Sequence, residues 1–67
     1  MEEKTAPELA DLVLQELSVG GVFVKVHPDP VLGWKPTVVT GPENVVALQA
    51  AADKIAQRLR TKYTLKK

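Results

Sequence analysis

Apolar residues recur at helical spacing near the start of the chain. From Leu9 to Leu17 every fourth residue is apolar, which places these side chains on one face of a helix. The sequence TAPE at residues 5–8 supplies the threonine and glutamate of a capping box around a proline of the first turn. The glycine pair at 20–21 is typical of a helix end, because glycine readily adopts the left-handed conformation. The pattern predicts a helix over about residues 6–18.

A second and clearer helical stripe occupies the C-terminal third of the chain. It is preceded by TGPE at residues 40–43, which repeats the T-x-P-E pattern of the first helix start. We expect this helix to span about residues 42–62 and a frayed tail to follow over 64–67. The apolar residues at helical spacing are Val45, Leu48, Ala52, Ile55, Ala56, Leu59 and Tyr63.

Between these segments the apolar period changes from helical to alternating. Valines at every second position predict a strand over about residues 22–27. The sequence PDPVLG at 28–33 predicts a turn, because it combines two prolines with a glycine. A second strand is predicted over about 34–40. Pro36 has no N–H group for a ladder, so this strand must lie at an edge, with position 36 facing outward or bulged.

These elements predict an α+β fold of helix, strand, strand and helix in a single domain over residues 1–67. The strands form an antiparallel two-stranded hairpin packed against the two helices. Such a hairpin is marginal by itself, and a chain of this length buries only about 60% of its surface on folding. There is no cysteine, so disulfides cannot compensate. We therefore expect self-association, through a four-stranded sheet across a two-fold axis or through helix packing.

The chain has more apolar surface than one copy can bury. The apolar arc of the first helix is wider than an ordinary surface helix needs, and the turn at 28–33 carries aliphatic side chains on a stiff loop, which suits a protein contact. Trp34 has an alternative role, because it can fold back and fill the core. We predict a small non-enzymatic interaction or assembly module that acts as a homodimer or binds a protein partner. The candidate contact residues are Leu12, Leu14, Phe23, Val31, Leu32 and Trp34.

Charge is distributed unevenly along the chain. Residues 1–20 hold five acids and one lysine, whereas residues 46–67 hold six bases and one acid. Lys54, Arg58 and Lys62 follow one another at four-residue spacing, so the alternative prediction is a nucleic-acid-binding face on the second helix. A simpler explanation is that bases complement the dipole at the helix end and that the acidic helix lies beside the basic one.

Few residues offer chemistry. His27 is the single histidine, and with Asp29 it gives two ligands where a tetrahedral metal site needs more. No glycine-rich phosphate loop precedes a helix. We therefore predict no enzymatic activity, no metal and no cofactor. No apolar run approaches the roughly 20 residues of a membrane span, and the acidic start is unlike a signal peptide, so we expect no membrane contact and a cytoplasmic location.

The order of the expected elements and the length of the chain look like those of the small phage head–tail joining protein W. Gly33-Trp34 before an alanine-rich helix resembles small bacterial proteins with two strands and a helix. Neither resemblance matches a motif residue by residue. They therefore imply a fold, and no site or activity.

Overall fold

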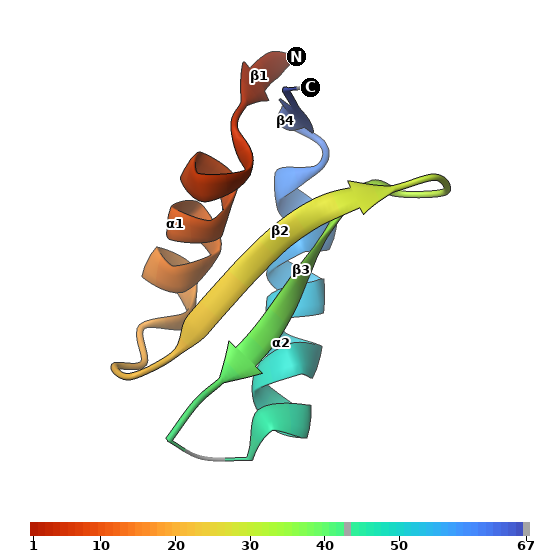
Figure 1. Ribbon diagram of the computed structural model, residues 1–67. Coiled ribbons are helices and arrows are strands. Elements are labelled where there is room, and N and C mark those ends of the chain that lie inside the picture. The colour runs from red at the N-terminus through yellow and green to blue at the C-terminus, as the bar shows by residue number, and fades with distance from the viewer. Residues whose placement is uncertain (43, 67) are drawn as a thin grey trace.

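The computed structural model describes residues 1–42 and 44–66 and has an α+β fold (Figure 1). Two helices accompany a two-stranded antiparallel sheet, and two short strands near the termini form a separate parallel pair. In chain order the elements are β1 (Glu2–Lys4), α1 (Ala6–Leu17), β2 (Phe23–Asp29), β3 (Gly33–Thr40), α2 (Val45–Leu59) and β4 (Tyr63–Leu65).

Both helices lie against one face of the β2–β3 hairpin, with α1 on the β2 side and α2 on the β3 side (Figure 1). Alternate residues of each strand point toward the helices, which is the pattern that the valines of β2 predicted. The opposite face of the hairpin is open to solvent. The buried hydrophobic residues are Leu9, Ala10, Val13, Val24, Val26, Trp34, Val38, Leu48, Ala52, Ala56 and Leu59.

Trp34 is the largest side chain of this core and is only 1% exposed. Its indole Nε1–H donates to the carbonyl oxygen of Tyr63 at 3.3 Å. The guanidinium of Arg60 lies over the ring, 5.4 Å from its centroid. Trp34 therefore fills the core, and its prediction as an exposed partner contact is corrected: the indole is not part of the surface.

The first helix begins as its sequence predicted. The Thr5 hydroxyl accepts from the Glu8 amide, and the Glu8 carboxylate accepts in return from the Thr5 amide, which completes the capping box. The helix ends at Leu17, and Ser18 takes the left-handed position with φ of 56°. Gly21 is left-handed as well, with φ of 76°, but it lies three residues beyond the cap, so Ser18 and not the glycine pair supplies the helix end.

The second helix begins later than predicted. Thr40 is the last residue of β3 and does not cap it, and Glu43 of the predicted cap lies outside the described residues. Asn44 is the cap, because its side-chain oxygen accepts from the amides of Val46 and Ala47. The helix ends at Leu59, which is three residues before the predicted limit.

The predicted frayed tail over 64–67 is instead largely structured, although Lys67 lies outside the described residues. Strand β4 pairs in parallel with β1, with Glu2 opposite Tyr63. The Lys4 ammonium forms an ion pair with Glu2 at 3.1 Å and lies 5.6 Å from the centroid of the Tyr63 ring. These contacts hold the two ends of the described chain side by side (Figure 1).

Candidate protein-binding surface

The outer edge of β3 is occupied by side chains of α2 and of the residue that follows it. The Gln49 amide accepts from the Val38 N–H at 2.7 Å and donates to the Pro36 carbonyl oxygen at 3.0 Å. Arg60 Nε donates to the Trp34 carbonyl oxygen at 2.8 Å. Pro36 has no N–H to satisfy. Its backbone points away from β2, which agrees with the outward-facing edge position that the missing N–H predicted, although its side chain is buried. These contacts close the β3 edge to another strand.

The same contacts show which way the backbone of β2 points. Because the bonded groups of Pro36 and Val38 point away from β2, their opposite residues Val26 and Val24 form the non-hydrogen-bonded pairs of the hairpin. The N–H and C=O groups of Val24 and Val26 therefore point away from β3. No hydrogen bond within residues 1–42 and 44–66 reaches these groups. The free edge of β2 thus keeps unused donors and acceptors.

An apolar groove of about 350 Å³ runs between this edge of β2 and helix α1. Val24 and Val26 line this groove, although only 4% and 9% of their surfaces are exposed. Ala10 and Leu14 line the helix side of the groove. A groove beside unpaired strand groups suits an added strand, because main-chain bonds and apolar contacts can form together.

Some of the candidate contact residues of the first helix and of β2 line this groove, and one does not. Phe23 lines the groove and is 53% exposed. Leu14 also lines it and is half-buried. Leu12 is half-buried against the core and does not line the groove. Two of these three residues therefore lie where an added strand would contact them.

The tip of the hairpin carries two other candidate contacts. Val31 is 88% exposed and Leu32 is 48% exposed. The Asp29 carboxylate accepts from the amides of both residues at 2.8 Å, which fixes the turn. The amide of Leu32, followed by that of Val31, holds the pKa of Asp29 below its usual value. The tip therefore presents aliphatic side chains on an ordered loop.

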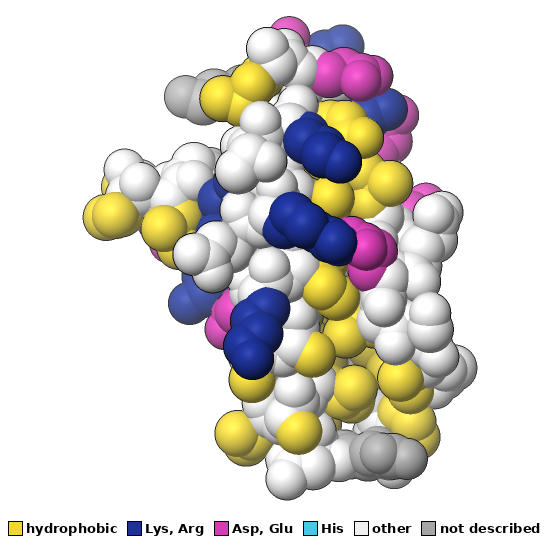
Figure 2. All heavy atoms as spheres, turned by 180° about the vertical axis from the view of Figure 1, so that it is seen from behind, with side chains coloured by type: hydrophobic (Ala, Val, Ile, Leu, Met, Phe, Trp, Pro, Cys, Tyr) yellow, Lys and Arg dark blue, Asp and Glu magenta, His cyan; other side chains and the backbone are white. Residues whose placement is uncertain are grey.

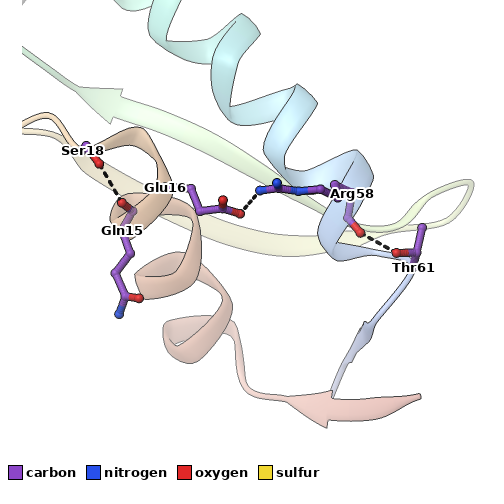
Figure 3. Close-up of polar contacts among 5 residues, drawn as sticks. All are labelled: Gln15, Glu16, Ser18, Arg58 and Thr61. Carbon is purple, nitrogen blue, oxygen red and sulfur yellow. Dashed lines mark hydrogen bonds and ion pairs between the residues drawn. The ribbon is translucent and has the colours of Figure 1, made fainter.

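The basic residues proposed for nucleic-acid binding are all exposed. Lys54, Arg58 and Lys62 follow one another along and just beyond α2, and Figure 2 shows basic side chains in a row on this face. Arg58 forms an ion pair with Glu16 of α1 (Figure 3). The simpler explanation of the charge pattern is thus confirmed at this contact, because the acidic helix supplies a partner for the basic one. The row retains Lys54 and Lys62 as charges toward solvent.

His27 lies on the open face of the hairpin, where its Nε2 is 2.8 Å from the Thr37 hydroxyl. Over the described ranges, no group of three or more histidine, aspartate or glutamate side chains is placed to hold a metal ion. None of the helices in these ranges combines the length and the apolar character needed to cross a membrane.

No protein-family model, no curated protein and no solved structure matches this chain. The likeness to the head–tail joining protein W depends on the expected order of elements and the length of the chain, and the structure adds β1 and β4 to that order. The surface that the fold presents has the groove between β2 and α1 as an apolar feature.

Proposed function

We propose that this chain is a small non-enzymatic protein-interaction module that acts as a homodimer, joined through the free edge of β2. The observation that carries the proposal is the difference between the two edges of the hairpin. Gln49 occupies the edge of β3, whereas the outward groups of Val24 and Val26 have no partner within the described residues. A strand edge left open beside an apolar groove is a template for another strand.

The composition of the groove supports a second copy as the occupant. A two-fold axis places a surface against an identical surface, so a strong net charge of either sign would make the two copies repel each other. The groove has one acid, Asp11, and one base, Lys25, at its lining, which leaves no excess of either sign. Antiparallel pairing of the two β2 strands would then give a four-stranded sheet and cover Phe23.

This arrangement leaves the hairpin tips available. The dimer would form along the edge of β2 at Val24 and Val26, whereas Val31 and Leu32 lie beyond the far end of the strand. Each copy would therefore present one ordered aliphatic tip away from the axis. We propose these tips as the contacts for a further protein partner, because exposed apolar side chains on a fixed loop lose little freedom on binding.

The test compares two variants that place a lysine on exposed positions of the same hairpin. Phe23→Lys brings additional positive charge to the proposed interface, whereas Val39→Lys, 47% exposed on β3, lies away from it. Size-exclusion chromatography with light scattering should give a dimer mass for the parent chain and for Val39→Lys, and a monomer mass for Phe23→Lys. A parent chain that stays at 7.3 kDa at high concentration would overturn the proposal.

Nucleic-acid binding is the second candidate function. The observation that favours it is the row of exposed bases, in which Lys54 and Lys62 extend the charge on either side of Arg58. Binding would depend on phosphate contacts and would therefore weaken steeply with salt. The homodimer remains the leading proposal, because the ion pair with Glu16 uses the central charge of the row.

A further inference from the structure

The β2 edge restricts how two copies can pair, and we propose the register that places Phe23 opposite Lys25 of the partner subunit. This inference rests on the proposed homodimer and adds its geometry. It follows from which residues of β2 offer outward backbone groups and from the side chains that each register would bring together.

Three antiparallel registers use the outward backbone groups of Val24 and Val26. Val24 and Val26 offer both an N–H and a C=O, whereas Pro28, the next outward position, offers only a C=O. A two-fold axis can therefore pass beside Val24, beside Lys25 or beside Val26. Each choice fixes every other pair, because a shift of the axis by one residue moves the partner strand by two.

Two of these registers carry a penalty. An axis beside Lys25 places this lysine directly opposite Lys25 of the partner subunit, and like charges directly opposite one another destabilise a sheet. An axis beside Val26 places Val24 opposite Pro28 of the partner subunit. The proline cannot donate, so the outward carbonyl of Val24 would be left without its hydrogen bond.

The remaining register, with the axis beside Val24, avoids both problems. Val24 would exchange two hydrogen bonds with Val24 of the partner subunit. Val26 would lie opposite Val22 of the partner subunit, which directly precedes β2 and, unlike a proline, has an N–H to donate. Phe23 and Lys25 are both exposed and lie on the open face of the hairpin. In this register each lysine can place its ammonium over the ring of the facing phenylalanine, which is a favourable contact.

Cysteine cross-linking tests the register, and the background is clean because the chain has no cysteine. Phe23→Cys and Lys25→Cys chains are prepared separately, mixed, and exposed to a mild oxidant. Facing residues of a non-hydrogen-bonded pair are close enough for a disulfide. We expect the mixed Phe23→Cys–Lys25→Cys disulfide as the main product by intact-mass spectrometry. Val39→Cys, exposed on β3, is the control and should gain no mass with either chain.

The outcomes separate the register from the proposed dimer. A His27→Cys chain is added to report the register with the axis beside Val26. Disulfides within Lys25→Cys alone, or between Lys25→Cys and His27→Cys, would overturn the register and leave the β2 dimer standing. A dimer mass by light scattering without any of these disulfides would overturn the register and move self-association to another surface. A monomer mass for the parent chain would overturn both.

Discussion

The side-chain amide of Gln49 donates to the carbonyl oxygen of Pro36 at 3.0 Å and so joins α2 to the edge of the hairpin. The same amide accepts from the Val38 N–H at 2.7 Å. One side chain therefore satisfies two backbone groups, one on each side of Thr37, that another strand would otherwise use. Its nitrogen also donates to the Asp53 carboxylate at 2.9 Å, which fixes the orientation of the amide.

Removal of this amide should lower stability. In Gln49→Ala the Pro36 carbonyl and the Val38 N–H lose their partners in a part-buried site, which costs about 1–3 kcal/mol for each group left unsatisfied. Urea unfolding followed by circular dichroism measures the change. Gln57→Ala is the matched control, because Gln57 is exposed on the same helix and should change stability by less than about 0.5 kcal/mol. Equal effects of the two variants would contradict the role given to Gln49.

Replacement of the core indole should be more severe. Trp34→Ala removes the largest buried side chain, and such truncations typically cost about 3–5 kcal/mol. This cost is comparable to the whole free energy of unfolding of a small domain. Trp34→Phe keeps a ring and loses the hydrogen bond to the Tyr63 carbonyl, so it should fold with a lower urea midpoint. Fluorescence of the parent chain provides a direct check, since this is its single tryptophan. Emission typical of an exposed indole, readily quenched by acrylamide, would contradict the burial.

The hairpin tip should depend on pH through Asp29. Its folded pKa is depressed by the amides of Leu32 and Val31, so the ionised carboxylate stabilises the turn. That contribution is present above the unfolded pKa of about 3.9 and is lost as the pH falls through the lower folded value. NMR titration into this acidic range should shift both amide signals together. In Asp29→Asn the side chain keeps an acceptor without titrating, so the shifts should disappear; shifts that persist there would rule out this cause.

The basic row should give weak binding to nucleic acid at most, because Arg58 already has Glu16 as its partner. Fluorescence anisotropy with generic duplex DNA should show little binding at physiological salt. If binding does occur, it should fall steeply with salt, and Lys54→Glu with Lys62→Glu should weaken it. Lys35→Glu, on β3 and outside the groove lining, is the control for a charge change elsewhere. Tight, salt-sensitive binding lost only in the α2 variants would favour the second candidate function.

The features that local sequence patterns predicted are those that depend on neighbours along the chain. The capping box of Thr5 and Glu8 forms within four residues, and the alternation of Val24 and Val26 follows from the period of a strand with one buried face. The start of α2 was predicted too early because the sequence has two candidate N-cap residues, Thr40 and Asn44. Asn44 satisfies two amides, whereas Thr40 is still part of a strand.

The features that the sequence did not predict depend on contacts between distant residues. Strands β1 and β4 have three residues each, which is too short for a recognisable alternation, and they pair across almost the whole chain. The closure of the β3 edge by Gln49 is equally invisible, since a glutamine on a helix is usually solvated. For the candidate surface, Phe23 could be identified from its exposed strand position, but the groove beside it required the placement of α1.

The closed side of the hairpin has a consequence for the size of any assembly. A hairpin with two open strand edges could pair with another copy at each edge and so add copies without limit, as in cross-β fibres. Because Gln49 occupies the edge of β3, each copy would have one open strand edge, and the proposed pairing of two β2 edges would leave none for a third copy. The helix that stabilises β3 would in this way also terminate polymerisation at a pair.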